Sequence, residues 1–193
     1  MEISLKKTAA NAASFTTKFI KTISLVLLVC TATNAAVNAK TIPQVNQKKQ
    51  IAEYKKAKDN IKQVECLTKN IYYEAGHEPK EGKYAVAQVT INRLESGKFP
   101  NSICGVVQQK SVIENRVVCQ FSWVCENYAQ KPINRQLWEE SRQIAKKFVV
   151  ENHRMPKLKT AFYFHNDQVS PGWPNPKITK IGRHIFYSER KRK

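Results

Sequence analysis

The amino-acid sequence predicts an α+β fold, with one helical core and a small antiparallel β-sheet beside it. Apolar residues recur at helical spacing between residues 51 and 94, and again between residues 137 and 149. Two runs rich in aromatic and β-branched residues follow, at 161–164 and 181–187, and such runs are typical of strands. The chain has 193 residues, which is enough for one domain with its own core.

The first expected helix ends near Gly76. Its apolar residues at helical spacing are Ile51, Tyr54, Ile61, Val64 and Ile71. Residues 40–50 are polar and rich in lysine, so we expect a solvated linker before the helix. Gly76 is expected to adopt a left-handed cap conformation and Pro79 cannot continue a helix, so the two residues predict its end.

A second helix is expected to begin near Lys80, and it is apolar on most sides, which predicts that it is buried. Its core residues are Ala85, Val86, Val89 and Leu94. A short helical turn is expected at 103–108. The region 111–131 lacks clear periodicity, and we expect a loop there with a short strand at 119–121.

Asn134 is a suitable N-cap for a third helix. Its expected core stripe consists of Leu137, Trp138, Ile144, Ala145, Phe148 and Val149. The two strand-like runs follow, separated by a loop that contains three prolines, and we expect them to pair as an antiparallel sheet. Phe121, Tyr163 and Phe186 are assigned to the core.

Residues 1–39 have the features of a signal peptide. Lysines precede an apolar run at 23–29, which is too short to span a bilayer, and Val37-Asn38-Ala39 fits a signal peptidase site. Lipidation at Cys30 is disfavoured, because Val29 stands where such sites have a small residue. An uncleaved N-terminal anchor is the alternative. We therefore expect a periplasmic or secreted protein that meets the membrane only through its signal peptide.

The chain is strongly basic, with a formal net charge of +18, and it remains basic without its signal peptide. Such a charge predicts attraction to a polyanion. Export argues against nucleic acid as the partner and favours the cell wall, whose peptides carry carboxylates. A lysine-rich surface without any partner is the alternative interpretation.

Four cysteines remain after the signal peptide, namely Cys66, Cys104, Cys119 and Cys125. An even number in an oxidising compartment predicts two disulfides, and the sequence leaves their connectivity open. A zinc site is disfavoured, because the chain has no C-x-x-C pair and its histidines are scattered. We expect no metal and no cofactor.

Glu74 is the candidate acid. It lies in an apolar, aromatic segment at the end of the first expected helix, where desolvation would raise the pKa of a carboxyl group. A raised pKa is what a glycosidic general acid needs at neutral pH. A glutamate at a helix end can also be a cap or an ion-pair partner, so this pattern alone is weakly specific.

Three groups of residues resemble, in the right order, the motifs of the SleB/CwlJ cell-wall hydrolase family. The opening group is IYYEAGHEP at 71–79, Gly82, AVA at 85–87, Val89, NR at 92–93 and FP at 99–100. The middle group is CGVV at 104–107 and CQFS at 119–122. The closing group is HN at 165–166, VSP at 169–171, Trp173, IG at 181–182 and HIFY at 184–187.

The resemblance covers about residues 64–187 and implies a lysozyme-related catalytic domain, similar to spore-cortex-lytic enzymes, that acts on the muramyl glycan of peptidoglycan. It also implies that Glu74 is the catalytic residue. The chain departs from the family at Gly76-His77, where Arg-Gly is usual, so the turn behind Glu74 can differ from that of the family.

The expected organisation is a signal peptide (1–39), a linker with the helix start (40–60), the catalytic domain (61–189) and a basic tail (190–193).

The inventory of carboxylates favours a mechanism with one glutamate. Hydrolysis by a pair of carboxylates needs two of them beside the scissile bond. Beyond the predicted signal peptide the only aspartates are Asp59 and Asp167. We therefore predict a lytic transglycosylase, in which Glu74 is acid and then base and the C6 hydroxyl of muramic acid attacks. Glu78 and Asp167 are the second-carboxylate candidates if water attacks instead.

Polar and aromatic residues of the middle and closing groups are the candidates for binding sugar, because amides, hydroxyls and aromatic faces recognise carbohydrates. They are Gln120, Ser122, His165, Asn166, Trp173 and His184. Trp173 could instead simply pack in its loop, and His184 could be a satisfied histidine within a strand.

Two other functions remain open. A peptidoglycan amidase or endopeptidase would need zinc or an activated cysteine. The segment 77–81 superficially resembles a zinc helix motif, but Glu81 stands where the second histidine would be. A noncatalytic wall-binding module is the other alternative, which the presence of Glu74 disfavours. A regulatory protein partner is possible and is not specified by the sequence.

Overall fold

The structure is a computed structural model that describes residues 44–126 and 133–190. The predicted signal peptide at 1–39, the end of the predicted 111–131 loop and the last three residues of the basic tail lie outside the described residues. The helices are α2 (Gln44–Ala75), α3 (Lys80–Glu95), α4 (Ile103–Val107) and α5 (Arg135–Val149), with 3-10 turns η1 (Ser122–Val124) and η3 (Pro156–Leu158). The strands are β1 (Lys110–Ile113), β2 (Arg116–Cys119), β3 (Ala161–Asn166), β4 (Lys177–Ile181) and β5 (His184–Ser188).

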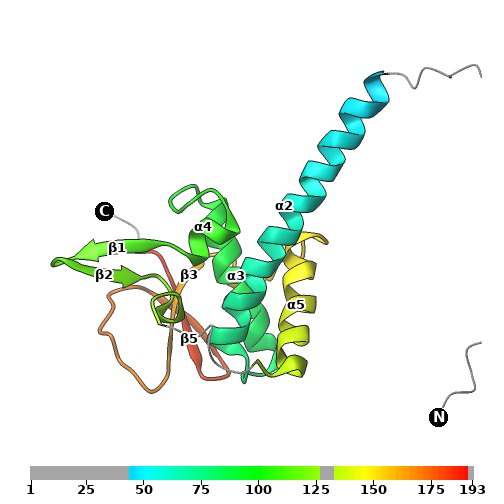
Figure 1. Ribbon diagram of the computed structural model, residues 1–193. Coiled ribbons are helices and arrows are strands. Elements are labelled where there is room, and N and C mark those ends of the chain that lie inside the picture. Colours follow the sequence, from blue (N-terminus) through cyan, green and yellow to red (C-terminus); the bar gives the residue numbers. More distant parts are fainter. Residues whose placement is uncertain (1–43, 127–132, 191–193) are drawn as a thin grey trace, which may run out of the picture. The chain divides into compact units, whose positions relative to one another are not determined.

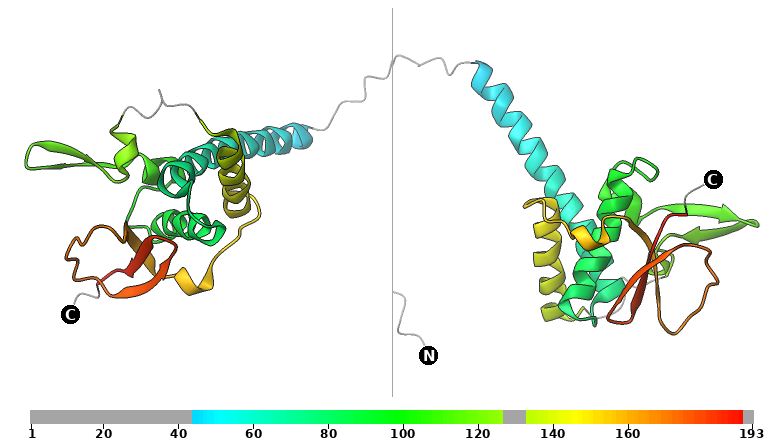
Figure 2. Two further views of the ribbon diagram at one scale, coloured as in Figure 1. Left: turned by 90° about the horizontal axis from the view of Figure 1, so that it is seen from below. Right: turned by 180° about the vertical axis from the view of Figure 1, so that it is seen from behind.

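Helix α3 is the centre of the described domain. It contacts α4, α5 and β3, and it lies between α5 on one side and the β-strands on the other (Figure 1, Figure 2). Most of its residues between 82 and 93 are buried, as its apolar sequence predicted. The expected α+β architecture, a helical core with a small antiparallel sheet, is confirmed.

Two apolar clusters meet on α3. One joins it to α2, α4 and α5, and its buried members include Leu67, Ile91, Val107 and Phe148. The other joins it to the sheet, and consists of Ala85, Val89, Leu158, Ala161 and Phe186. A helix that serves both clusters is covered on most sides, which is why even its polar residues Lys83, Gln88, Thr90, Asn92 and Arg93 are buried. Phe121 and Phe186 are buried as expected, whereas Tyr163 is only half-buried.

Helix α2 is longer than the sequence analysis predicted. It begins at Gln44, so the expectation of a linker over residues 40–50 is wrong for its described part. Glutamine and lysine make up five of the seven residues 44–50 and have high helix propensity, which explains the extension. The apolar residues of the first half remain in solvent, with Ile51, Tyr54 and Ile61 at 54%, 68% and 70% exposed. Only from Val64 onward does α2 pack into the core.

The turn between α2 and α3 differs from the prediction. Gly76 is not among the residues with positive φ, so the expected left-handed cap is wrong. The glycine is required for another reason, because a Cβ at this position would lie 2.4 Å from the carbonyl oxygen of Tyr72. Pro79 then occupies the N-cap position of α3, which is consistent with its expected role as a breaker.

The main sheet is antiparallel with strand order β3-β5-β4. The predicted single run at 181–187 contains a turn, in which Gly182 has a φ of +58°, and it therefore contributes the end of β4 and most of β5. Strand β4 was not predicted, because the prolines and lysines before Ile181 obscure its alternation.

A second, two-stranded sheet replaces the first part of the predicted 111–131 loop. Strands β1 and β2 form a hairpin whose turn residues Glu114 and Asn115 have φ values of +49° and +62°. Its side chains are exposed on both faces except for half-buried Cys119, so the sequence shows no alternation of apolar and polar residues. The expectation of a loop was therefore wrong for residues 111–119, and the expected strand at 119–121 is present only at its first residue, Cys119, where β2 ends.

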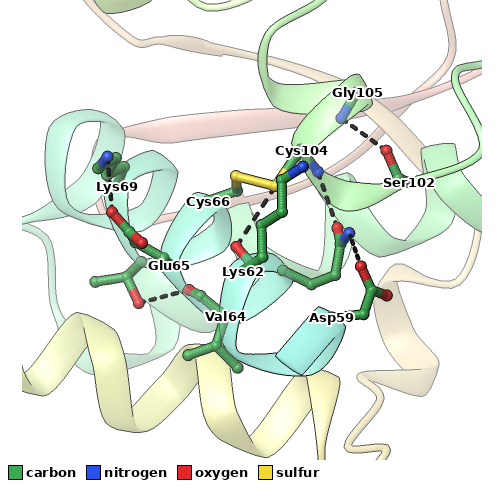
Figure 3. The surroundings of a disulfide bond; sticks show 11 residues. Asp59, Lys62, Val64, Glu65, Cys66, Lys69, Ser102, Cys104 and Gly105 are labelled. Atoms are coloured by element: carbon green, nitrogen blue, oxygen red, sulfur yellow. Dashed lines mark hydrogen bonds and ion pairs between the residues drawn. A yellow bond between two sulfur atoms is a disulfide. The ribbon is translucent and has the colours of Figure 1, made fainter. Parts of the chain in front are cut away.

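Both predicted disulfides are formed, and neither joins neighbouring strands. Cys66–Cys104 links α2 to α4 with a Cα–Cα distance of 5.2 Å (Figure 3). Beside it, the side chain of Gln63 accepts a hydrogen bond from the backbone N–H of Cys104 at 3.1 Å. Cys119–Cys125 closes the short loop that follows the hairpin. No helix in the described part of the chain is both long and apolar enough to cross a lipid bilayer.

Candidate active site

Glu74 lies in the last turn of α2 and is half-buried. Burial raises the pKa of its carboxyl group from 4.5 to about 7, because the charged form loses hydration. Two charges modify this pKa: the guanidinium of Arg93 lowers it, and the carboxylate of Glu126 raises it further. A carboxyl group with a pKa near 7 is poised to donate a proton and to take one back at neutral pH.

Aromatic neighbours fix the end of α2 that carries Glu74. The hydroxyl of Tyr72 accepts a hydrogen bond from the backbone N–H of Asn134 at 2.9 Å, and its ring packs against Trp138 of α5. The ring of Tyr73 stacks on Trp123, with 4.8 Å between the centroids. Because contacts hold the residues immediately before Glu74 on two sides, the carboxyl group is presented from a rigid helix turn.

Arg93 is a buried cation held mainly by neutral groups. It is 2% exposed, and among the described residues it forms no ion pair with a carboxylate. Its Nε donates to the carbonyl oxygen of Phe162 at 2.8 Å. The rings of Phe99, Phe121 and Tyr163 lie 5.3–5.9 Å from the guanidinium carbon. Burial lowers the pKa of Arg93 to about 10, so it remains charged at neutral pH.

Helix α3 positions this cation through its bonds to β3. The side chain of Asn92 donates to the carbonyl oxygens of Leu158 and Ala161, each at 2.7 Å, and Arg93 bonds the next carbonyl along the chain. The register between α3 and β3 is thereby fixed. The electrostatic partner of Glu74 is therefore part of the core and not a mobile surface side chain.

The segment of residues 120–126, called here the 120–126 segment, lies against both α2 and α3. With its amide oxygen turned toward the guanidinium, Gln120 accepts from the two terminal nitrogens of Arg93 at 3.2 and 3.3 Å. Phe121 is buried beneath the same guanidinium. Trp123 donates from its indole nitrogen to Asn70 of α2 at 3.2 Å. Ser122 begins η1 and is exposed.

An aromatic cluster on the sheet continues from Arg93. Tyr163, which faces the guanidinium, packs against Trp173, and Trp173 packs edge-on against both His165 and Tyr187. His165 Nε2 lies 2.8 Å from the hydroxyl of Tyr187. Trp173 is 40% exposed, so part of its ring is open to solvent. The predicted sugar-binding residues Gln120, His165 and Trp173 are therefore connected through Arg93 and Tyr163.

The two candidates for a second carboxylate, Glu78 and Asp167, lie at a different place, around the turn between β4 and β5. Glu78 accepts a hydrogen bond from the backbone N–H of Arg183 at 2.9 Å. Asp167 forms ion pairs with Lys180 at 2.7 Å and Arg183 at 4.0 Å, and the hydrogen bond from Lys180 lowers the pKa of Asp167. The pKa of Glu74 is shifted by the charges of Arg93 and Glu126. Neither Glu78 nor Asp167 contributes to that shift.

His184 and Asn166 belong to the structure of the sheet. His184 is 5% exposed and packs edge-on against Phe164, and burial lowers its pKa, so the neutral ring is favoured. Its Nδ1 has no hydrogen-bond partner within residues 44–126 and 133–190. Asn166 accepts at its side chain from the backbone N–H of Gln168 at 3.0 Å and so shapes the loop after β3.

Sequence reasoning missed Arg93 and Glu126 as site residues. The signal for Arg93 was present, because an arginine within a helix that is predicted to be buried needs a neighbouring anion or aromatic rings. Glu126 gave no such signal. It is exposed, and only the folded course of the 120–126 segment brings its charge near α2.

Two hollows of the described surface lie elsewhere. The larger, of about 750 Å³, is lined by α2 and α5, and the smaller, of about 240 Å³, lies near α4. None of the predicted site residues lines either hollow. No group of three or more potential metal ligands is present among the described residues.

The chain was compared with known proteins. The family model "Cell Wall Hydrolase" matches residues 77–187. The matched region begins three residues after Glu74, so the match covers Arg93, Glu126 and the sheet but not the proposed acid.

Two curated relatives are spore cortex-lytic enzymes. The one from Oceanobacillus iheyensis is 33% identical over 127 residues, covering 64% of this chain and 40% of the relative. The one from Bacillus subtilis is 31% identical over 127 residues, covering 64% of this chain and 36% of the relative. The chain thus matches about two fifths of the length of these relatives.

Two solved structures also resemble the chain, each at 26% sequence identity and over 65% of this chain. They are the catalytic domain of the Bacillus cereus SleB protein, with a TM-score of 0.48 and 89% of that chain covered, and the catalytic domain of a germination-specific lytic transglycosylase, SleB from Bacillus anthracis, with a TM-score of 0.49 and 93% covered.

Proposed function

The chain belongs to the cell wall hydrolase family, and from this premise we propose that it is an exported enzyme that cleaves the glycan strands of peptidoglycan, with Glu74 as its acid and base. The scissile bond joins muramic acid to glucosamine. The observation that carries the proposal is a half-buried carboxyl group with a pKa of about 7, placed beside a buried arginine at the end of a fixed helix.

The first step of the proposed reaction is proton donation. The protonated carboxyl group of Glu74 donates to the glycosidic oxygen while the bond from that oxygen to C1 of muramic acid breaks. Glu74 becomes a carboxylate next to the positive charge of Arg93, which favours the ionised form. Burial makes Glu74 a proton donor at neutral pH, and Arg93 keeps the pKa low enough for the proton to leave.

The second step returns the proton. The Glu74 carboxylate accepts the proton of the C6 hydroxyl of the same muramic acid, and the C6 oxygen bonds to C1 to form a 1,6-anhydro ring. No water is consumed, and Glu74 ends protonated as it began. An intramolecular hydroxyl can have an effective concentration of about 10⁵ M or more, which disfavours competition by water.

Substrate recognition is proposed for Gln120 and Ser122 of the 120–126 segment and for the aromatic cluster on the sheet. Trp173 offers a partly exposed ring face for a sugar, and Tyr163 connects it to Arg93. We leave Asn166 and His184 out of this role, because the structure uses Asn166 to shape a loop and buries His184.

Export is supported by the predicted signal peptide and by the two disulfides, which are typical of oxidising compartments. The basic surface then suits a wall whose peptides carry carboxylates. Cleavage of the peptide stem by a cysteine nucleophile is disfavoured, because every cysteine among the described residues is in a disulfide.

Hydrolysis is the second candidate reaction, and one observation favours it. Glu126 is a carboxylate whose charge acts on Glu74, so it could serve as the base that activates water. This role replaces the one considered for Glu78 and Asp167, whose carboxylates are engaged at the β4–β5 turn.

Digestion of purified peptidoglycan separates these reactions. We expect soluble muropeptides that end in 1,6-anhydromuramic acid, lighter by one water than the reducing ends that lysozyme produces from the same wall. Mass spectrometry of the products is the measurement. Reducing ends as the main product would show that water attacks, cut peptide stems would indicate an amidase or endopeptidase, and wall binding without release would indicate a binding module.

A further inference from the structure

The two disulfides lie in different surroundings. Cys66–Cys104 joins two helices of the core across 38 residues of sequence. Cys119–Cys125 spans only 6 residues and encloses the greater part of the 120–126 segment, which lies against Arg93 and α2. The second bridge therefore borders the candidate active site, and the segment that it encloses reaches the core through Phe121.

The enclosed segment has one buried side chain, that of Phe121, with Trp123 and Val124 packed against the same core cluster. Its regular structure is the single 3-10 turn η1, and on its N-terminal side it continues into the hairpin β1–β2, whose side chains are almost all exposed. It meets α3 through Gln120 and Phe121 at Arg93, and α2 through Trp123 at Asn70 and Tyr73. A short segment with so little secondary structure needs a further constraint to keep one conformation.

The same contacts create the environment of Glu74. Phe121 packs beneath Arg93, Trp123 covers one side of the last turns of α2, and Glu126 directly follows Cys125. The charged groups that act on Glu74 are Arg93 from α3 and Glu126 from this segment. If the segment moved away, Glu74 would gain hydration and would lose the repulsion from Glu126, while Arg93 would stay on α3.

We propose that the Cys119–Cys125 disulfide is a positioning element of the active site, which holds the 120–126 segment against Arg93 and α2, so that the site is complete only in the oxidised chain. The proposal rests on the proposed function of Glu74. Opening the bridge loosens this side of the site and leaves the helical core folded, because the core is held by α3 and by Cys66–Cys104.

The accessibility of the bridge suits such a role. Cys125 is exposed and Cys119 is half-buried, whereas Cys104 is buried at 6% exposure. A dithiol reductant such as dithiothreitol supplies two electrons and two protons to the disulfide. The chain gains two thiols, and the reductant becomes a cyclic disulfide. The exposed bridge should react first.

The test compares Cys119→Ser/Cys125→Ser with the matched control Cys66→Ser/Cys104→Ser in the full chain without its signal peptide. For each variant we measure thermal unfolding and the pH dependence of kcat and of kcat/KM on soluble glycan strands. In the first variant we expect the alkaline limb of kcat/KM to move down by roughly one pH unit, because both effects that raise the pKa of Glu74 are weakened. At pH 8 this lowers kcat/KM roughly tenfold, since the protonated fraction falls tenfold per pH unit. The core variant should melt at a lower temperature and keep its alkaline limb.

A wild-type alkaline limb and wild-type KM in Cys119→Ser/Cys125→Ser would overturn the proposal. If that variant does not fold, graded reduction of the wild-type chain replaces it, with alkylation and peptide mass spectrometry to identify the open bridge. Activity must then fall in step with opening of Cys119–Cys125, and activity that persists with this bridge open would overturn the proposal. Failure of the proposed function is distinguishable, because the oxidised wild-type chain would then release no glycan fragments.

Discussion

Glu74 at the end of α2 and the two residues at the β4–β5 turn, Glu78 and Asp167, have the same carboxyl group in different surroundings. Glu74 is half-buried, and burial raises its pKa to about 7. Asp167 is exposed, and its hydrogen bond to Lys180 lowers its pKa, while Glu78 accepts from the backbone of Arg183. Glu78 therefore joins the α2–α3 connection to the sheet, and Asp167 joins the end of β3 to β4 and the β4–β5 turn. At the end of α2, Glu74 is half-buried and has no ion-pair partner among the described residues, which leaves its carboxyl group available to a substrate.

The β4–β5 turn packs closely against Glu78, which indicates a structural role for this glutamate. A Cβ on Gly182 would lie 2.0 Å from a carboxylate oxygen of Glu78, so the turn and the glutamate occupy adjoining space. The positive φ of Gly182 requires glycine in any case. A carboxylate is therefore not catalytic merely because it lies near Glu74 in the sequence, as Glu78 does. The groups that surround it in the folded chain decide its role.

The distinction between Glu74 and the two carboxylates at the turn would be lost if Glu74 were not needed for activity. Glu74→Gln keeps the size and polarity of the side chain and removes its titratable proton, so we expect a loss of kcat by roughly 10²- to 10⁴-fold. Release of soluble muropeptides from purified wall is the measurement. Circular dichroism of the same preparation checks that the variant is folded. Near wild-type release would show that the acid lies elsewhere.

The comparison would be sharpened by changing the charge beside Glu74. Arg93 lowers the pKa of Glu74, so Arg93→Gln should raise it and move the alkaline limb of kcat/KM up by roughly one pH unit. The direction follows because the active form is protonated and persists to higher pH when its pKa is higher. Arg93→Lys keeps the charge and is the matched control. Equal pH profiles for the two variants would mean that packing, and not charge, is the contribution of Arg93.

The smallest expected effect concerns the carboxylate at the turn. Asp167 has its ion pairs with Lys180 and Arg183 at the surface, so Asp167→Asn should change kcat/KM by no more than about twofold, as is usual for surface substitutions. The assay is the same digestion of glycan. A loss comparable to that of Glu74→Gln would place Asp167 in the reaction and would end the distinction drawn between the two regions.

Much of the helical fold could be predicted from the sequence, because its signals are local. Asn134 accepts from the backbone N–H of Leu137 as an N-cap should, and the apolar sequence of α3 predicted its burial. The start of α2 was missed, because propensity extends a helix without any packing partner. The hairpin β1–β2 was missed, because strands that are exposed on both faces carry no alternating pattern.

The candidate site could be predicted only in part. The apolar segment around Glu74 predicted a desolvated acid, and the raised pKa agrees with that expectation. The roles of Glu78 and His184 could not be read from the motif, since they depend on tertiary partners at Arg183 and Phe164. Glu126 is 52 positions away from Glu74 in the sequence, and only folding brings their charges together.

The burial of Glu74 also makes the stability of the fold depend on pH. A carboxyl group whose pKa rises from 4.5 in the unfolded chain to about 7 in the folded chain binds its proton more tightly in the folded state. Below pH 4.5 the folded state carries no penalty from Glu74, and the penalty grows as the pH rises until it is complete above pH 7. The shift corresponds to at most about 3 kcal/mol of unfolding free energy. At neutral pH the folded state is therefore less stable than it would be without the buried carboxyl group, which holds a proton at the end of α2.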